Sequence, residues 1–249
     1  MSAIPAAAPP SRIFALDWAR TAALVAMAAF HAGRDLEVLG IWPPGSTFGG
    51  AWDLAARTIA GSFVFLAGLS LWLAHGRTIR WRAFGRRLGL LVLAAGAVSL
   101  GTWLFAPAVW VRFGILHSIA LCSVLSLPFL KAPWWISAAT GAAILWWGPS
   151  LDLRAFDGAG WVWTGLSRTV PPMMDWEPVV PWLAPMLLGV AVGRLGTAVS
   201  LWPRLAVRPR DPGRVAHALA LPGRHSLAVY LIHQPLIVGA ILAWIRMGR

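Results

Sequence analysis

Long apolar stretches separated by short basic loops are the feature that most limits what this chain can fold into. Apolar stretches of roughly 17 to 25 residues are typical of helices that cross a bilayer, and shorter ones are accepted when tryptophan flanks them. The sequence contains seven candidates: residues 13–34, 54–74, 87–106, 111–130, 133–149, 181–199 and 226–245. Charged residues make up only 12% of the chain, against roughly 25% in soluble proteins. The sequence therefore predicts an all-α fold, a polytopic transmembrane helix bundle of about seven spans in the lipid bilayer.

Basic residues predict how this bundle is oriented. Residues 1–12, rich in Pro and Ala, are expected to form a flexible N-terminal tail, and residues 13–249 a single transmembrane domain. Arginine concentrates in the loops after the second and sixth expected spans: Arg77, Arg80, Arg82, Arg86 and Arg87, then Arg204, Arg208, Arg210, Arg214 and Arg224. Loops rich in Arg stay in the cytoplasm. We therefore expect a cytoplasmic N-terminus, with loops 35–53 and 150–180 on the outer side.

Several classes of protein are excluded by what the sequence lacks. The net charge of +12 comes from Arg in short loops, which topology explains better than a nucleic-acid partner does. The single cysteine, Cys122, allows neither a disulfide framework nor a cysteine metal site. The glycine motifs of nucleotide-binding proteins, the H-E-x-x-H of zinc proteases and the G-x-S-x-G of serine hydrolases are all missing from the sequence. Soluble nucleotide enzymes and zinc hydrolases are therefore excluded, and no metal is expected.

The first expected span carries charges that are costly inside lipid. Arg20 and His31 are eleven residues apart, which at about 100° per residue brings both to one face of a helix, about 16 Å apart along its axis. Asp17 lies three residues before Arg20, and Asp35 lies four residues after His31. Each pair is within reach on a helix. Asp17 and Arg20 can therefore neutralise one another, and Asp35 can orient the imidazole of His31 and stabilise its protonated form.

The expected topology brings charged residues from four segments to similar depth in the outer half of the membrane. They are His31, Arg34 and Asp35 in the first segment, Asp53 and Arg57 in the second, Arg112 and His117 in the third, and Asp175 and Glu177 in the fourth. A lone intramembrane charge is as often a packing or snorkelling residue as a functional one. A cluster with charges of both signs and two histidines favours a functional site. The sequence thus predicts one shared polar cavity.

The other histidines and the small residues also have purely structural interpretations. For His117 a packed role and a working role stay equally open, whereas His233, beside Gln234 and Pro235, is expected to have a structural hydrogen-bonding role. Three histidines in the expected cytoplasmic loops are predicted to be solvated: His75, His217 and His225. Small residues at 67–70, and Gly189 with Gly193, favour close packing between helices.

Five blocks of the sequence, in order, resemble a known family. They are LDWARTAALVAMAAFHAGRDL, FVFLAGLSLWLAH, VRFGILHSIALCSVL, DWEPVVPWLAPMLLGVAVGR and GRHSLAVYLIHQP. Together they look like the bacterial branch of the heparan-alpha-glucosaminide N-acetyltransferase catalytic-domain family, which belongs to a wider group of transmembrane acyltransferases. The likeness runs from Ile13 to Gly239. The chain departs from the animal lysosomal enzymes in having fewer spans and no lumenal domain, so that the identity of the acceptor does not carry over from them. Heparan sulfate itself is not expected in what looks like a bacterial chain.

The resemblance implies an acyltransferase of the bacterial inner membrane. Its donor would be acyl-coenzyme A, most simply acetyl-coenzyme A, taken from the cytoplasm, and its acceptor a sugar amine or hydroxyl, or another small hydroxyl or amine compound, on the outer side. Related acyltransferases carry an Arg or Lys, ten further residues and a His in the first helix, a spacing that Arg20 and His31 share. By similarity His31 is the catalytic candidate and Arg20 a donor-site residue.

The residues and the resemblance together assign a role to each member of the site. The residues expected to be catalytic are His31, Asp35, Arg112 and His117. The phosphates of the donor are expected to bind Arg20, Arg86 and Arg87. The acceptor is expected to bind Arg34, Asp53, Arg57, Asp175 and Glu177. His31 would deprotonate the acceptor or carry the acyl group, while Arg112 or a backbone N–H stabilises the oxyanion.

Two other classes of function use the same residues. A proton-coupled permease or other transporter also needs buried His, Asp and Arg groups, although the sequence shows no inverted repeat. A helical subunit would use them only to hold partner helices together. The sequence leaves open a homodimer, and it does not choose between direct transfer and an acyl-histidine intermediate.

Overall fold

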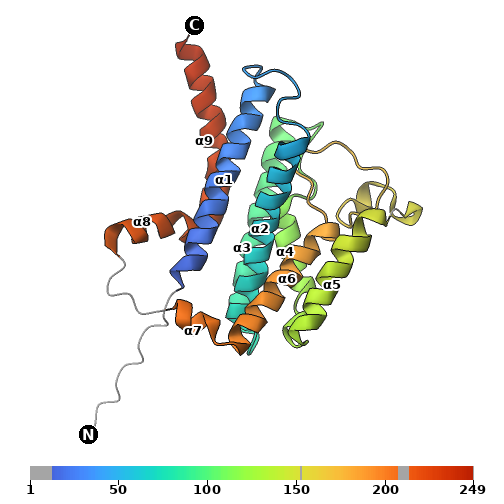
Figure 1. The fold of residues 1–249 in the computed structure, drawn as a ribbon. Helices are drawn as coiled ribbons and strands as arrows, with labels where there is room; N and C mark the ends of the chain where they lie inside the picture. Colours follow the sequence, from blue (N-terminus) through green and yellow to red (C-terminus); the bar gives the residue numbers. More distant parts are fainter. Residues whose placement is uncertain (1–12, 152, 207–212, 249) are drawn as a thin grey trace. The chain divides into compact units, whose positions relative to one another are not determined.

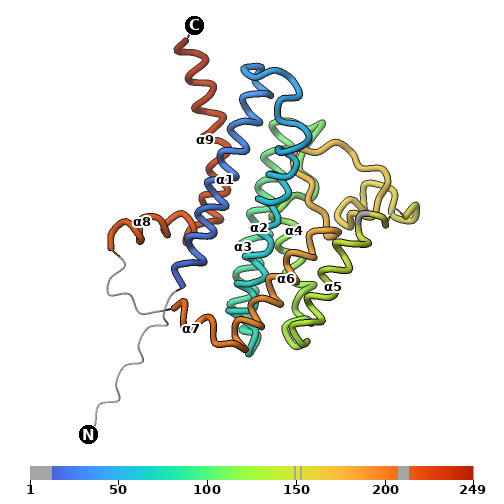
Figure 2. The backbone as a smooth tube through the Cα atoms, viewed as in Figure 1, coloured from blue at the N-terminus to red at the C-terminus, as the bar shows by residue number. Residues whose placement is uncertain are grey.

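A computed structural model describes residues 13–151, 153–206 and 213–248, and within these ranges the regular elements are all helices (Figure 1). The expected N-terminal tail, residues 1–12, lies outside the described part of the chain. The helices fall into two compact units. The terminal unit combines Met1–Ser46 with Gly196–Arg249, and the central unit is Thr47–Leu195. Figure 2 traces the backbone from blue at the N-terminus to red at the C-terminus.

The terminal unit is built on a long helix, α1 (Phe14–Val38), which packs against α8 (Gly213–Arg224) and α9 (Ser226–Met247). A short helix, α7 (Leu201–Leu205), also belongs to this unit. Helices α1 and α9 lie side by side and run in the same direction (Figure 1). The hydroxyl of Thr21 donates to the carbonyl of Leu219 at 2.8 Å and accepts from the N–H of Gly223 at 2.9 Å. These bonds fix the first turns of α1 against the end of α8.

The described part of the central unit contains five α-helices and four short turns of 3-10 helix. The α-helices are α2 (Gly50–His75), α3 (Trp81–Phe105), α4 (Ile115–Leu125), α5 (Trp134–Trp147) and α6 (Val179–Ala198), whose last turn is assigned to the terminal unit. The 3-10 turns are Pro128–Leu130, Gly148–Ser150, Arg154–Phe156 and Ala159–Trp161. Leu71, Trp72, Phe84, Leu130 and Val190 form a buried cluster at the end of the unit where α2 finishes and α3 begins. This cluster lies beside the first Arg-rich loop.

Two glycines allow the backbones of α2 and α6 to touch. A Cβ added to Gly68 would lie 2.0 Å from the carbonyl oxygen of Met186, and one added to Gly189 would lie 2.1 Å from that of Phe65. Real Cβ atoms do not approach a carbonyl this closely, so only glycine is accommodated at either position. The expectation that these small residues serve close helix packing is confirmed.

Four described helices are long and apolar enough to cross a membrane: α2, α3, α6 and α9. A helix forms at each of the seven predicted stretches, but the count of seven spans is not confirmed. Helix α4 has only 11 residues and α5 only 14. At about 1.5 Å per residue both are shorter than the roughly 30 Å of hydrocarbon in a bilayer. Helix α1 has 25 residues but carries five charged ones, and it is not among these four helices.

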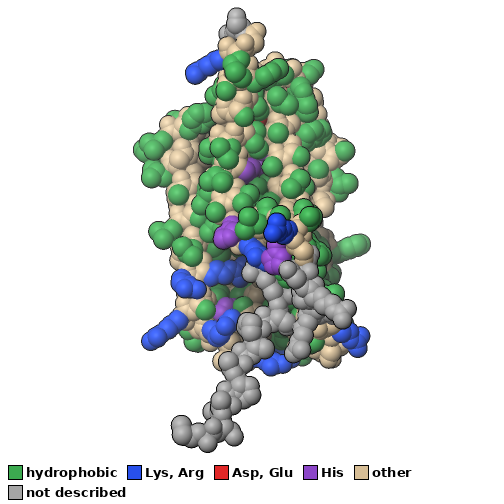
Figure 3. Space-filling model, turned by 90° about the vertical axis from the view of Figure 1, so that its left-hand side faces the viewer, with side chains coloured by type: hydrophobic (Ala, Val, Ile, Leu, Met, Phe, Trp, Pro, Cys, Tyr) green, Lys and Arg blue, Asp and Glu red, His purple; other side chains and the backbone are tan. Residues whose placement is uncertain are grey.

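The surfaces of the long helices are apolar, as a lipid environment requires. Side chains of α3 such as Leu93, Leu104 and Phe105 are largely exposed, and every residue in the span of α9 is at least partly exposed. Hydrophobic side chains cover much of the face in Figure 3. Exposed apolar surface of this extent marks a lipid or partner interface. We conclude that the chain is a helical membrane protein.

The structure corrects two expectations about the predicted cytoplasmic loops. The segment after the sixth stretch contains α7 and α8, where the sequence predicted a loop, because Arg214, His217 and Pro222 interrupt the apolar pattern of α8. His75 is buried rather than solvated. Its Nδ1 accepts a hydrogen bond from the backbone N–H of Arg80 at 3.2 Å, and its ring meets Phe84 edge-on. His75 therefore holds the end of α2 against the start of α3.

Candidate active site

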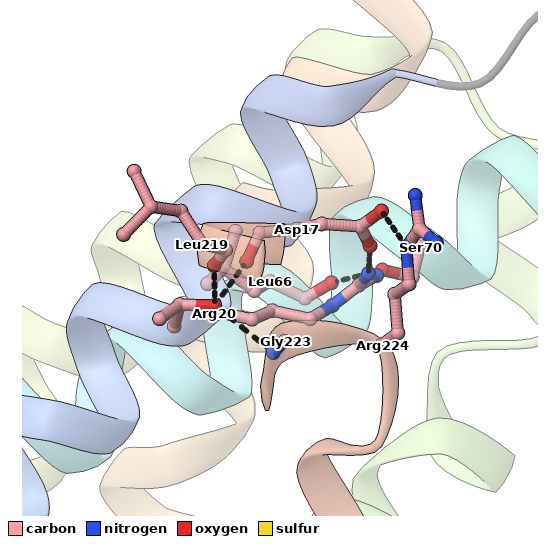
Figure 4. Close-up of polar contacts among 8 residues, drawn as sticks. Asp17, Arg20, Leu66, Ser70, Leu219, Gly223 and Arg224 are labelled. Carbon is pink, nitrogen blue, oxygen red and sulfur yellow. Dashed lines mark hydrogen bonds and ion pairs between the residues drawn. The ribbon is translucent and has the colours of Figure 1, made fainter. Parts of the chain in front are cut away.

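The polar face of α1 is turned toward other helices of the terminal unit. Near its start, the buried carboxylate of Asp17 forms ion pairs with Arg20 (Nη1 to Oδ1, 3.1 Å) and with Arg224 (Nε to Oδ2, 3.8 Å) (Figure 4). The predicted pairing of Asp17 with Arg20 is confirmed. A carboxylate shared by two guanidinium groups offsets much of the cost of burying these charges. It also joins the beginning of α1 to the junction of α8 and α9.

Farther along α1, the imidazole of His31 contacts that of His233 on α9, with ring centroids 5.1 Å apart. The Nδ1 of His233 lies 2.5 Å from the carbonyl oxygen of Tyr230. Because a carbonyl only accepts, Nδ1 must carry the hydrogen, and the Nε2 of the neutral ring is then an acceptor. This Nε2 is buried and has no hydrogen-bond partner among the described residues.

The next residue on α9 contacts the second predicted catalytic group. The side-chain nitrogen of Gln234 donates to both carboxylate oxygens of Asp35, each at 2.9 Å. A carboxylate only accepts, so the amide must present its NH₂ group, which directs Oε1 away from Asp35. That Oε1 is also buried without a hydrogen-bond partner in the described part of the chain. Two buried acceptors thus lie on neighbouring residues of α9.

Unpaired buried acceptors are costly, at about 1–3 kcal/mol each, and native proteins keep them where a ligand or another donor meets them. Next to His31, they fit a ligand that offers N–H or O–H groups. The sequence missed His233 and Gln234 as members of the site. Its signal was the pair of polar residues before Pro235 in an otherwise apolar span, but spacing alone does not reveal which helix lies against α1.

Other predicted members of the terminal unit have partners of their own. The Asp35 carboxylate receives the hydrogen bonds of Gln234, and its contact with the imidazole of His31 stays a prediction. Arg34 forms an ion pair with Glu37 at 3.5 Å, and Glu37 also accepts a hydrogen bond from the N–H of Gly45 at 2.7 Å. Arg34 thereby helps to fix the loop after α1.

In the central unit, His117 lies in the first turn of α4 with both ring nitrogens in use. Nδ1 accepts from the N–H of Gly114 at 3.3 Å, so Nε2 carries the hydrogen and lies 3.3 Å from the hydroxyl of Ser99. That hydroxyl in turn donates to the carbonyl of Val111 at 2.7 Å. A ring satisfied on both sides has no lone pair left for a substrate. Of the two interpretations, this geometry favours packing.

The carboxylates of Asp175 and Glu177 lie beside the same end of α4. Asp175 accepts a hydrogen bond from the N–H of Ile115 at 2.9 Å and caps the helix. The N–H of Glu177 donates to the carbonyl of Phe113 at 3.1 Å. Burial raises the pKa of both carboxyl groups, and the neighbouring Asp175 raises the pKa of Glu177 further. Glu177 is therefore held protonated at neutral pH.

Glu177 gives the central unit a pH-dependent stability. A carboxyl group whose pKa is higher in the folded state than its ordinary value of 4.5 stabilises the fold at acidic pH, and this contribution is lost as the pH rises through the raised pKa. We expect Glu177→Gln to remove the loss. On going from about pH 5 to about pH 9, the free energy of unfolding of the variant should rise relative to that of the native chain by on the order of 1 kcal/mol. This corresponds to roughly 2–4 °C in unfolding temperature. Thermal unfolding at both pH values measures this; parallel curves for the two proteins would contradict it.

Arg112 completes this group. Its guanidinium lies over the ring of Trp110, 5.1 Å from the centroid, and its Nη1 is buried with no hydrogen-bond partner within the described ranges. The segments that carry Arg112 and His117 are hydrogen-bonded to the segment of Asp175 and Glu177, whereas the joint role of these four side chains stays a prediction. That they share one cavity with His31 and Asp35 stays a prediction.

The remaining predicted residues lie on α2 and α3. Asp53 accepts a hydrogen bond from the N–H of Gly49 at 3.2 Å, and Arg57 is exposed one turn later. Arg86 is exposed and Arg87 partly buried on the second turn of α3. At about 1.5 Å per residue, Ser99 lies about 20 Å farther along α3 than Arg86. The Arg-rich end of the central unit is therefore opposite the end that carries Asp175.

A comparison with protein families matches residues 12–235 to the family described as "Heparan-alpha-glucosaminide N-acetyltransferase, catalytic". No curated protein and no solved structure matches the chain. The matched range covers most of the sequence and includes all of the predicted site residues. On this evidence, the chain belongs to the heparan-alpha-glucosaminide N-acetyltransferase catalytic-domain family.

Proposed function

We propose that this membrane acetyltransferase moves an acetyl group from acetyl-coenzyme A to an amine or hydroxyl of a glycan-type acceptor, with His31 as its catalytic group. The observation that supports the proposal most is the meeting of α1 with α9. There His31 contacts His233, Asp35 binds Gln234, and two buried acceptor atoms lack partners. An acceptor that donates N–H or O–H groups matches this set of atoms.

The chemistry needs a group that takes a proton from the acceptor. A neutral His31 can accept it while the acceptor nitrogen or oxygen attacks the thioester carbonyl; the carbon–sulfur bond then breaks, and the proton passes to the coenzyme A thiolate. Like charges repel, so two imidazoles in contact hold one proton more readily than two. The pair is thus suited to receiving a single proton in each turnover.

We place the phosphates of the donor at the Arg-rich end of the central unit, on the cytoplasmic side of a bacterial inner membrane. Arg86 is exposed there, and guanidinium groups bind phosphate oxygens well. In contrast, Arg20 is already paired with Asp17. We assign Arg20 mainly to holding α1 in position.

This assignment predicts how Arg86 affects the kinetics. We expect Arg86→Ala to raise the KM for acetyl-coenzyme A about fivefold while kcat changes little, because a contact with the phosphates is made equally before and during the reaction. Arg57→Ala, at the other end of the unit, is the control and should leave this KM unchanged. Equal effects of the two substitutions would contradict the assignment.

A transporter built on the same polar groups is not favoured, because the family that the chain belongs to is described by its transferase catalytic domain. The two activities are separated by measuring coenzyme A release from acetyl-coenzyme A by purified protein in detergent. An acetyltransferase releases coenzyme A in proportion to acetylated acceptor. Release of one equivalent without acceptor indicates an acyl-histidine intermediate, and release only with acceptor indicates direct transfer. No release with any amine or hydroxyl acceptor, combined with solute flux in proteoliposomes, would overturn the proposal.

A further inference from the structure

We propose that α8 is an interfacial helix that binds the surface of an anionic membrane. One stripe of the helix is already covered. Ala220 and Gly223 are buried, and the carbonyl of Ala216 accepts a hydrogen bond from the indole of Trp18 on α1 at 3.2 Å. Residues 216, 220 and 223 follow each other at helical spacing. They form the side of α8 that faces α1.

A second apolar stripe on α8 is uncovered. Val215 is 74% exposed and Leu219 is 56% exposed. They are four residues apart, so their side chains lie one turn apart on the same side of the helix. This stripe adjoins the one that contacts α1. Together the two make an apolar face that is much wider than α1 alone covers.

Within α8 itself, every charged side chain is an arginine. Arg214 is exposed on α8, next to Val215 in the sequence. In the sequence, Asp211 precedes the helix, and no Asp or Glu follows it up to Arg249. An apolar stripe bordered by arginine is typical of helices that lie in the headgroup region of a membrane with anionic lipids. The charge therefore favours lipid over a neutral surface.

The direction of α8 and its small apolar surface also support membrane lipid as the partner of this stripe. In Figure 1, α8 runs crosswise to both α1 and α9. A helix that crosses the direction of a spanning helix is suited to lying in the plane of the interface. The three largely exposed apolar side chains of this 12-residue helix, Val215, Leu219 and Leu221, also offer far less than the roughly 800 Å² per partner of a stable protein interface. A second copy of the chain is a poor match for this stripe.

The test uses an environment-sensitive fluorophore on single cysteines. Cys122 is buried, and a Cys122→Ala background, checked for normal thermal unfolding, leaves no competing thiol. Leu219→Cys reports on the apolar stripe. His217→Cys is the matched control, because His217 is exposed about 200° around the helix from Leu219, where its ring meets that of Phe14 on α1 edge-on. Each labelled protein is placed in vesicles of phosphatidylcholine with phosphatidylglycerol, containing lipids that carry a shallow spin-label quencher.

We expect the quencher in the lipid to reduce fluorescence at position 219 about threefold more than at position 217, and aqueous iodide to show the reverse order. Leaving out phosphatidylglycerol, or introducing Arg214→Glu, should weaken quenching at 219. Equal lipid quenching at the two positions would overturn the proposal. So would protection at 219 that increases with the protein-to-lipid ratio, because that result indicates a second copy on the stripe. The result does not depend on whether the acetyltransferase assignment is correct.

Discussion

Replacing His31 by alanine is expected to lower kcat for acetyl transfer about 10³-fold, with little change in the unfolding temperature. A positioned base or nucleophile contributes about 10²–10⁴-fold to a rate, and His31 is the predicted catalytic group that also contacts another imidazole. The measurement is steady-state coenzyme A release by protein in detergent, with acetyl-coenzyme A and an amine acceptor at saturation.

The matched control for this substitution is His225→Ala. His225 is exposed immediately before α9, and its loss should leave kcat within about twofold of the native value, as for surface changes away from the chemistry. Gln234→Leu should have an intermediate effect, because it leaves the Asp35 carboxylate without its donor but keeps both imidazoles. A kcat for His31→Ala close to that of His225→Ala would show that the catalytic group lies elsewhere.

The second large effect concerns stability. We expect Gly68→Ala to destabilise the protein by about 2–3 kcal/mol, because the new Cβ would lie 2.0 Å from a backbone oxygen of Met186. Backbone cannot move aside as a flexible side chain can, so α2 and α6 must separate. For a chain of this size the loss corresponds to a fall of roughly 4–12 °C in unfolding temperature.

An opposite result is expected for a glycine in open space. Gly96 lies inside α3, and a Cβ added there meets no atom within 4 Å. Gly96→Ala should therefore stabilise the protein by about 0.5–1 kcal/mol through the lower flexibility of its unfolded chain. Thermal unfolding of both variants in one detergent makes the comparison. Similar shifts of the same sign would contradict the close approach of α2 and α6.

Local patterns in the sequence were enough to predict much of this fold. Apolar length located all seven stretches that form helices, and the small residues around Gly68 and Gly189 indicated the close pair of helices. The ion pair of Asp17 with Arg20 also followed from spacing, since residues three apart on a helix are neighbours whatever else surrounds them. Each of these features depends on one helix or on a simple property of its surface.

Features that depend on tertiary packing were not predictable in this way. Helix α8 was missed because Arg and Pro obscure its apolar pattern, and Arg224 at its end became a partner of Asp17 only through folding. His75 seemed solvated because it is close to arginines in sequence, yet it folds back onto Arg80 and Phe84. His233 and Gln234 lie about 200 residues from the groups they contact. No local spacing can reveal such a pairing.

The central claim is that the thioester reaches His31 on the polar face of α1. Bromoacetyl-coenzyme A tests it directly, because a nucleophile beside the carbonyl displaces bromide and keeps a mass label that peptide mass spectrometry can locate. We predict labelling of His31, suppressed by an excess of coenzyme A and absent from the His31→Ala variant. Labelling confined to residues outside α1 and α9, with the same protection by coenzyme A, would contradict the account.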